Sequence, residues 1–433
     1  MVSQQNGKLS EQSSIYLGVN KSTKTSSKPI TLNNGLQFFQ VSDTHLDIYY
    51  NDKVDGLNGQ LCRTMNQTDG YKVNFTEGSA PYWRVHCDSP YKLVQSSADY
   101  IKTLNEASNV KAQFILLSGN NDIPLHYNPP VEHPESFYGD LSKEVTKYIF
   151  PKSSVLAELN SVKEFNESFL QGGYYAVNVS EFLQLITLST NYWNSRCFTI
   201  NPSITTIGDR QMKWLENTFK TAAASNKKVL VSGHIPAGIS AYKDEGSFWL
   251  KNYTTVYVKL MTDFADIITL GQFYGHAHKD KIKIQNVHNS FYPNTQPSIP
   301  KAFLLMSPSI TPIQGNNAAF RLFTLSKDLE LSDYTQYYMD FILANVFSKP
   351  SWKKEYTFSE CYGASISAKS IQDIVQNVIS SSDNSTWVRY MTHMRTLYGG
   401  FSTEVMFREY CGAQHFTLEA YLACVKYYET NGF

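Results

Sequence analysis

Residues 273–280 read Phe-Tyr-Gly-His-Ala-His-Lys-Asp and stand at the end of an apolar, strand-like run. Two further histidine motifs occupy the same kind of place, Ser-Asp-Thr-His at residues 42–45 and Gly-His-Ile-Pro at residues 233–236. The chain has 10 histidines, and four of them lie in these three short segments. This concentration indicates that the three segments contribute to one site.

Residue types that bind metals recur in these motifs at a spacing of two. Asp43 and His45 form one pair, and His276 and His278 form another. Along an extended backbone, side chains two residues apart point to the same side. Together with His234, these side chains predict a site at three strand ends for a borderline metal such as Zn²⁺, Fe or Mn²⁺.

Strand-like apolar runs alternate with stretches of helical spacing, which predicts an α/β fold. The helical stretches are 92–108, 209–224 and Val256–Phe264. The strand-like runs are Leu36–Ser42, Ala112–Ser118, 173–178, 182–189, Lys228–Ser232, Ile267–Tyr274, 301–307 and 318–326.

The order of the motifs resembles that of the calcineurin-like metallophosphoesterases, and within them the acid sphingomyelinase and acid sphingomyelinase-like phosphodiesterase family. That family carries D-x-H, G-D, G-N-H, G-H and G-H-x-H in this order. Its variants G-H-I-P-x-G and F-F-G-H-x-H-x-D are similar to residues 233–238 and 273–280, and the resemblance spans roughly residues 37–330. It implies a two-sheet β-sandwich flanked by helices and a metal-dependent phosphodiesterase activity.

The resemblance also implies two metal ions, with zinc as the expected metal because His-rich sites of this kind favour it. Asp43, His45, His278 and a bridging residue would bind one ion. The same bridging residue would bind the other ion, together with His234, His276 and an Asn.

Two residues compete for the bridging position. Alignment by the strand Phe114–Gly119 places Asn120 there, whereas alignment by Asp-Ile-Pro-Leu-His at residues 122–126 places Asp122 there. We prefer Asp122, because this segment reproduces the family spacing from Asp to His. The choice matters because a bridging carboxylate holds two cations together and a neutral amide does so poorly.

The family's G-N-H motif has no counterpart between His126 and Gly172. By resemblance, that motif supplies the Asn ligand of the second ion and a histidine that protonates the leaving group, so the second site would be incomplete. His126 is the nearby candidate for the catalytic acid, and a loop histidine that only packs or forms hydrogen bonds is the alternative. We expect a phosphodiesterase of weakened activity that acts on a sphingomyelin-like phospholipid or a nucleotide. The alternative is a degenerate family member that binds a phosphate-bearing ligand or partner without turnover.

The composition limits the partners. Basic and acidic residues number 38 each, so a formal net charge of zero indicates no nucleic-acid-binding surface. No apolar run reaches the ~20 residues of a transmembrane helix. The expected partner is therefore a small-molecule or phospholipid phosphodiester substrate, and the oligomeric state is not readable from the sequence.

The chain has six cysteines without any C-x-x-C spacing, which favours disulfides over a zinc finger. We expect Cys62–Cys87 and then Cys411–Cys424 as pairs. The first fourteen residues contain no apolar segment of a secretory signal. The cysteines, the resemblance and the glycosylation sequons nevertheless favour a secreted or lysosome-like protein. The sequons stand at Asn20, Asn66, Asn74, Asn166, Asn178, Asn252 and Asn384.

We divide the chain into three parts. Residues 1–35 are polar and predict a disordered tail, 36–334 form the metallophosphoesterase catalytic domain, and 335–433 form a helical C-terminal subdomain. The helix-like stretches of the last part are Tyr337–Phe347, Ile371–Ser380, Trp387–Leu397 and Phe416–Tyr428.

Overall fold

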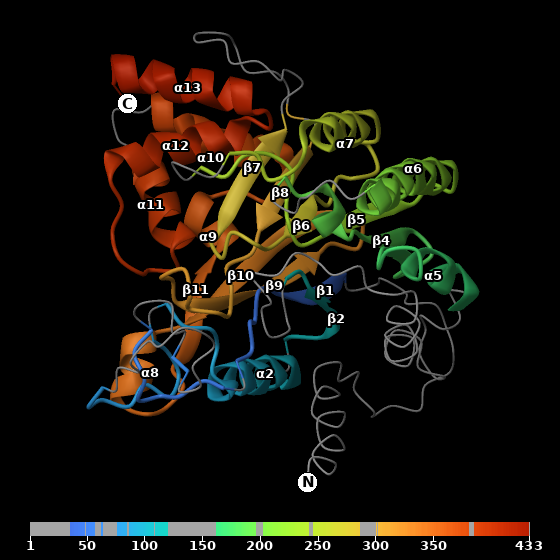
Figure 1. Ribbon diagram of the computed structural model, residues 1–433. Helices are drawn as coiled ribbons and strands as arrows, with labels where there is room; N and C mark the ends of the chain where they lie inside the picture. The colour runs from blue at the N-terminus through green and yellow to red at the C-terminus, as the bar shows by residue number, and fades with distance from the viewer. Residues whose placement is uncertain are drawn as a thin grey trace.

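Two β-sheets packed face to face form the centre of the protein, and helices lie outside them (Figure 1). The computed structural model describes residues 35–47, 49–56, 62–63, 76–84, 86–107, 109–119, 162–195, 202–241, 246–285, 300, 302–380 and 385–432. The expected α/β sandwich flanked by helices is confirmed. Residues 1–34 of the expected tail lie outside the described residues.

The first sheet has the order β11-β10-β9-β1-β2. Strand β1, next to the edge strand β2, pairs parallel with β2 and antiparallel with β9. Phe38 of β1 stacks on Phe114 and Phe323 of its neighbours, and the edge of its ring meets Phe273 of the second sheet at 5.6 Å between centroids. These aromatic rings join the two sheets. The strands are β1 (Leu36–Val41), β2 (Ala112–Leu117), β9 (Ala318–Leu325), β10 (Leu331–Met339) and β11 (Trp352–Thr357).

The second sheet has the order β3-β4-β5-β6-β8-β7. Strands β4, β5, β6 and β8 run parallel, and helices cover them, so they read as apolar runs without alternation. Because they are parallel, their carboxyl ends meet at one edge of the sheet. The strands are β3 (Tyr175–Asn178), β4 (Leu183–Thr187), β5 (Lys228–Ser232), β6 (Gln272–Tyr274), β7 (Lys281–Gln285) and β8 (Ala302–Met306).

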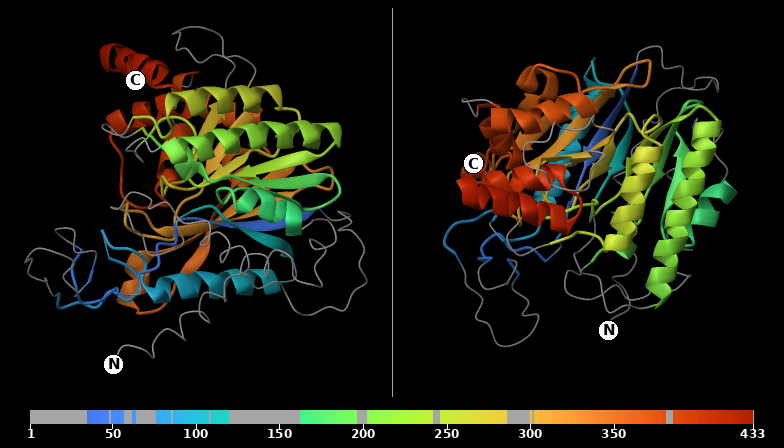
Figure 2. Two further views of the ribbon diagram at one scale, coloured as in Figure 1. Left: turned by 45° about the vertical axis from the view of Figure 1, so that its right-hand side comes forward. Right: turned by 90° about the horizontal axis from the view of Figure 1, so that it is seen from above.

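Helices cover the outer faces of both sheets. Helix α2 (Tyr91–Glu106) buries Leu93, Val94 and Ile101 against the first sheet. Helices α6 (Pro202–Ala224) and α7 (Lys251–Asp263) lie side by side on the second sheet, and α5 (Val162–Phe169) lies beyond β3 (Figure 2). A short 3₁₀ helix, η3 (Thr190–Trp193), places Trp193 against Trp249 and Tyr257 in the core under α7.

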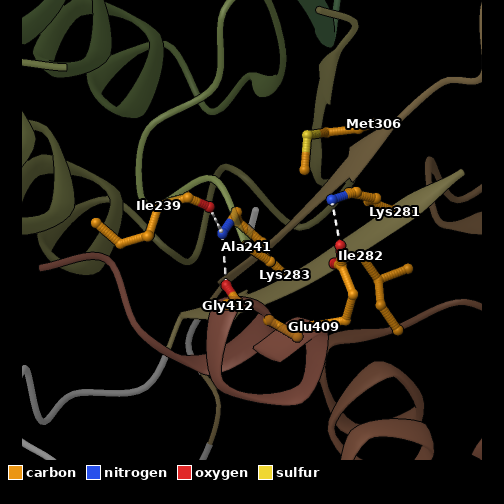
Figure 3. Close-up of a pocket in the computed structure, with 9 residues that line it drawn as sticks. Ile239, Ala241, Lys281, Ile282, Lys283, Met306, Glu409 and Gly412 are labelled. Carbon is orange, nitrogen blue, oxygen red and sulfur yellow. Dashed lines mark hydrogen bonds and ion pairs between the residues drawn. The ribbon is translucent and has the colours of Figure 1, made fainter. Parts of the chain in front are cut away.

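The C-terminal helices gather on the flank opposite to α6 and α7, along the edge strand β7 (Figures 1 and 2). Strand β7 is buried even at its two lysines, because helix α12 supplies partners. Lys281 donates to Glu409 (2.6 Å), and Lys283 donates to the carbonyls of Ile239 (3.0 Å) and Gly412, around a small cavity (Figure 3). The helices are α9 (Phe358–Tyr362), α10 (Ala368–Ser380), α11 (Ser385–Met394), α12 (Thr403–Gln414) and α13 (Leu418–Asn431).

Both expected disulfides are present, Cys62–Cys87 and Cys411–Cys424. The expected helix Tyr337–Phe347 is wrong in its first part: β10 continues to Met339, and helix α8 begins only at Phe341. Strand β10 also spans the expected domain boundary after residue 334, and that division stays a prediction. Within the described residues, no helix combines the length and the apolar content needed to cross a membrane.

Candidate metal centre

The expected ligands come from loops at the carboxyl ends of β1, β5 and β6, which lie close together. Two glycines permit this approach. A Cβ on Gly119, after β2, would lie 2.9 Å from the carboxyl carbon of Asp43, and one on Gly275, after β6, would lie 2.6 Å from Asp43 Oδ2. Any side chain at these positions would push the loops apart. The glycine in Gly-His-Ala-His thus has a steric role beside the histidines.

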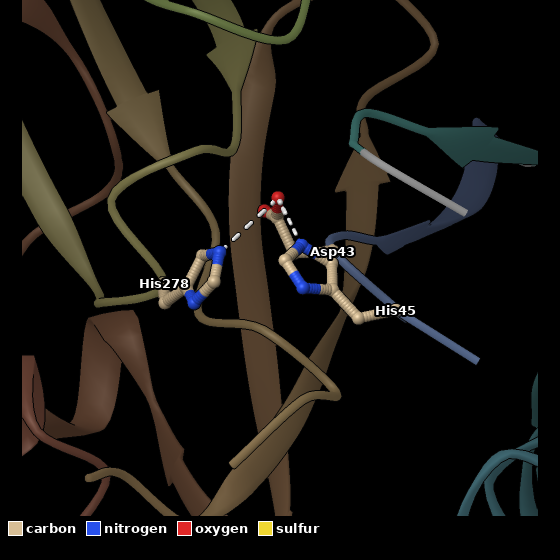
Figure 4. A group of neighbouring side chains, drawn as sticks. All are labelled: Asp43, His45 and His278. Atoms are coloured by element: carbon tan, nitrogen blue, oxygen red, sulfur yellow. Dashed lines mark ion pairs between the residues drawn. The ribbon is translucent and has the colours of Figure 1, made fainter. Parts of the chain in front are cut away.

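Asp43 is the centre of the cluster. Its Oδ1 lies 3.5 Å from His278 Nε2, 3.7 Å from His45 Nε2 and 3.7 Å from His234 Nδ1. Its Oδ2 accepts hydrogen bonds from the backbone N–H of His276 (2.9 Å) and from the Ser42 hydroxyl. One carboxylate oxygen is thereby held in place while the other faces three imidazoles, two of which appear in Figure 4.

The backbone at the cluster is left-handed, which corrects the expectation of an extended segment. Strand β1 ends at Val41, and φ is +47° at Asp43 and +41° at His45. His276 and His278 have φ values of +68° and +57°. Such conformations cost on the order of 1–3 kcal/mol each in non-glycine residues and are held only by the surrounding structure. The paired ligands converge because the loops turn, not because a strand alternates.

The donor atoms fit a bound cation. Asp43 Oδ1 is fully buried, and within the described part of the chain it accepts no hydrogen bond. A buried carboxylate oxygen without a partner is costly. The ligand atoms of Asp43, His45 and His278 lie within 4.8 Å of one another. One carboxylate oxygen and two imidazole nitrogens are a donor set that zinc and similar ions take.

The charges of the cluster keep Asp43 ionised and leave two of the surrounding histidines neutral. Burial raises the pKa of Asp43, but nearby His234 and His278 outweigh it and hold this pKa well below its usual range. Burial lowers the pKa of His234 and of His278, so both offer a neutral imidazole. Burial lowers the pKa of His45 as well, but the adjacent carboxylates of Asp43 and Asp88 raise it to about 9.

A second carboxylate, not expected from the sequence, orients His45. Asp88 Oδ1 lies 3.0 Å from His45 Nδ1, so Nε2 points to Asp43. Arg63 lies 3.9 Å from Asp88 Oδ2 and donates to Asp47 (2.6 Å). Arg63 and Asp88 directly follow Cys62 and Cys87, so the disulfide holds this pair beside the site. Ligating histidines commonly donate to a carboxylate. The position of Asp88 next to an expected disulfide was therefore the sequence signal that could have identified it as the partner of His45.

The remaining expected residues fall into two groups. His234 and His276 lie together at the more exposed side of the cluster, with 3.3 Å between His234 Nε2 and His276 Nδ1, and the ring of Phe248 packs on His276. Asp122, its competitor Asn120 and the candidate acid His126 lie outside the described residues. The structure therefore brings together five of the six expected ligands and does not test the bridging residue or the acid.

Comparison with known proteins shows which proteins the chain is similar to. Residues 299–431 match the family described as the acid sphingomyelin phosphodiesterase C-terminal region. The chain is 26% identical over 438 residues to the cyclic GMP-AMP phosphodiesterase SMPDL3A of Rattus norvegicus, covering 90% of this chain and 92% of the relative. It is 25% identical over 379 residues to the sphingomyelinase phosphodiesterase C of Dictyostelium discoideum, covering 77% and 79%. The chain thus resembles the acid sphingomyelinase-like phosphodiesterases.

The matched C-terminal region of the chain includes β8 to β11 and the helices along β7. The two relatives named above are phosphodiesterases. A solved dimetal phosphatase from Danio rerio aligns with 76% of this chain and 100% of its own, at 13% identity and a TM-score of 0.34.

Proposed function

We propose that this protein is a metal-dependent phosphoric diester hydrolase acting on a sphingomyelin-like phospholipid or a nucleotide. The observation that carries the proposal is the buried Oδ1 of Asp43, which faces His45, His234 and His278 at 3.5–3.7 Å. The names of the relatives support the substrate classes, since one is a cyclic GMP-AMP phosphodiesterase and another a sphingomyelinase phosphodiesterase.

The ligands divide into an inner and an outer set. Asp43, His45 and His278 are buried and would hold one ion. His234 and His276, with Asp122 as the proposed bridge, would hold the other, and we propose zinc at both. Bound there, the two ions would lower the pKa of a shared water and stabilise the attacking and leaving oxygens of an in-line displacement.

The chain's own residues position the reaction. The ionised Asp43 supplies the negative charge that holds cations at the strand ends, and Asp88 keeps His45 aimed at it. The His234 side chain is 15% exposed, so a phosphodiester would reach the cluster from the side of His234 and His276. We propose His126 as the acid that protonates the leaving alkoxide, a role worth about 10²–10⁴-fold in rate.

The second candidate is a protein that binds a phosphate-bearing ligand without turnover. It is favoured by one observation, the lack of a G-N-H sequence between His126 and Gly172. Both candidates need the metal cluster, so turnover is what separates them. For either, we propose a secreted or lysosome-like location, which the two disulfides support.

The test combines metal analysis with turnover of bis(p-nitrophenyl) phosphate. Protein purified without chelator should contain bound zinc and hydrolyse the ester. The variant Asp43→Asn should bind less metal, and its turnover rate should fall on the order of 10²-fold or more. The exposed Asp328, far along the chain in the β9–β10 turn, provides the matched control Asp328→Asn, which should retain both. Bound metal without turnover would establish the binding protein, and turnover that resists both chelator and Asp43→Asn would refute the metal mechanism.

A further inference from the structure

Helix α8 (Phe341–Val346) presents large apolar side chains to solvent. Ile342 is 64% exposed, Leu343 40%, Val346 69% and the following Phe347 71%. Residues four apart lie on one side of a helix, so Ile342 with Val346 and Leu343 with Phe347 form two adjacent rows. We call these four residues the α8 patch. Single exposed apolar residues are ordinary, but a contiguous group of this kind usually marks an interaction site.

The inner side of α8 is firmly attached, so the patch is not a frayed end. Phe341 and Ala344 are fully buried, and the Phe341 ring stacks on Trp83 with 5.3 Å between centroids. Asn345 donates to the Trp83 carbonyl (2.7 Å) and accepts from the Tyr82 N–H (3.1 Å). The Asp340 side chain caps the helix. The exposed rows therefore belong to a helix whose position is set by its other face.

Basic side chains lie at both ends of α8, Lys353 beside the N-cap residue Asp340 and Lys349 after the last turn. Lys349 and Lys353 are both exposed. The Lys353 ammonium lies 4.0 Å from Asp340, whereas Lys349 has no carboxylate within 4.0 Å in the part of the chain that the structure describes. An apolar centre with cationic residues at its edge matches the boundary between acyl chains and phosphate head groups. Because the net charge of the chain is zero, we expect the apolar rows to contribute most of the attraction between the protein and a bilayer.

The patch also lies next to the segment that leads into the metal centre. Tyr82 and Trp83, which α8 holds, precede Cys87 and Asp88, and Asp88 orients His45. Figure 1 shows α8 at the end of the molecule near α2, opposite to α13. A partner surface bound at α8 would thus lie beside the chain segment that leads to Asp88.

We propose that the α8 patch docks on the surface of a phospholipid bilayer. Docking itself does not depend on catalysis, and only its use, to present phospholipid phosphodiesters to the metal centre, rests on the proposed function. A second copy of the chain is the less suitable occupant. Stable dimers bury roughly 1,200–2,000 Å² in total, and four side chains of one short helix provide only a fraction of that area.

The test is flotation of the protein with vesicles of phosphatidylcholine, with and without phosphatidylserine. The parent should float with both. The double variant Val346→Ser/Phe347→Ser should bind at least about tenfold more weakly to both, because two exposed apolar anchors are lost. Lys349→Glu should weaken binding mainly to the vesicles that contain phosphatidylserine. Leu422→Ser, at a residue of α13 that is 51% exposed, is the matched control and should bind like the parent.

Turnover is measured in parallel on the soluble chromogenic diester and on vesicle-embedded sphingomyelin. The double variant should still hydrolyse the soluble diester but should lose activity on vesicle-embedded sphingomyelin. Equal vesicle binding by parent and double variant, or equal loss in Leu422→Ser, would overturn the proposal, as would a parent dimer in solution that the double variant dissociates. Vesicle binding that depends on the patch, without turnover of either substrate, would leave docking established and contradict the proposed hydrolase.

Discussion

Asp88 is a side chain through which the metal centre depends on the rest of the chain. It bonds His45 Nδ1 at 3.0 Å and is itself flanked by Arg63, which the Cys62–Cys87 disulfide keeps nearby. A carboxylate in this place fixes the tautomer and the direction of a ligating imidazole. The metal affinity of Asp43, His45 and His278 should therefore depend on a residue that touches no metal.

We predict that Asp88→Asn weakens metal binding about 10–100-fold while the fold persists. The dissociation constant would be measured by competition with a chromophoric chelator, and circular dichroism would verify the fold. Asp328→Asn, the exposed control, should bind metal like the parent. Unchanged affinity in Asp88→Asn would show that His45 is held by its loop alone.

The motif residues could be predicted from the sequence because Asp and His at strand ends are chemically distinctive. Asp43, His45, His234, His276 and His278 do lie together. The left-handed backbone that brings them there could not be predicted, because it depends on the close approach of Gly119 and Gly275 from other strands. Asp88 is likewise brought in by the fold, 43 residues along the chain from His45.

Strands and helices were predictable where apolar runs were long and pure, as in β1, β5 and β8. The error at Tyr337–Phe347 has a physical cause. Tyr337, Tyr338 and Phe341 have helical spacing, but the pairing of β10 with β9 and β11 on both sides extends the strand to Met339. The last strand, β11, was not predicted from the sequence, because its Lys-Lys-Glu centre is half solvent-exposed at the edge of the first sheet.

The contact between β7 and α12 leads to a prediction about pH. Burial lowers the pKa of Lys283 to about 7, the charge of Lys281 acts in the same direction, and Glu409 opposes it. His415 also faces this lysine, and burial and Lys283 lower the pKa of His415 to about 4. The unfolded chain keeps the Lys283 ammonium up to about pH 10.5, so it binds more protons than the folded chain between pH 7 and 10.5. The contribution of Lys283 to stability therefore rises with pH in this window.

Lys283→Met should remove this dependence. Between pH 7 and 9 the free energy of unfolding of the parent should rise by about 2 kcal/mol relative to that of the variant. Urea titrations at both pH values give the free energies of unfolding to be compared. His415 does not interfere, because its lowered pKa of about 4 lies below this pH range. The exposed Lys213→Met is the control and should follow the parent. Parallel pH profiles of parent and Lys283→Met would show that Lys283 keeps its charge when buried.

Contacts between residues before and after position 334 bear on the division into a catalytic domain and a helical subdomain. Strand β10 pairs with β9 from Leu331 to Met339, on both sides of residue 334, and β11 completes the same sheet. Asp280, two residues after the ligand His278, pairs with Arg321 and accepts from Tyr356 of β11. The loop that carries His278 is thus buried against residues from both sides of the proposed boundary.

A fragment of residues 36–334 should therefore not fold by itself. It would lack half of β10, all of β11 and the helices over β7. Asp280 would lose its hydrogen bond from Tyr356, and Lys281 would lose its ion pair with Glu409. A buried charge that loses its partner typically costs about 3–5 kcal/mol. We expect the full chain to unfold in one cooperative calorimetric transition. The fragment should show none and bind no metal, whereas co-expression with residues 335–433 should restore both. A cooperative transition and bound metal in the fragment alone would mean that residues 36–334 contain everything the metal centre needs.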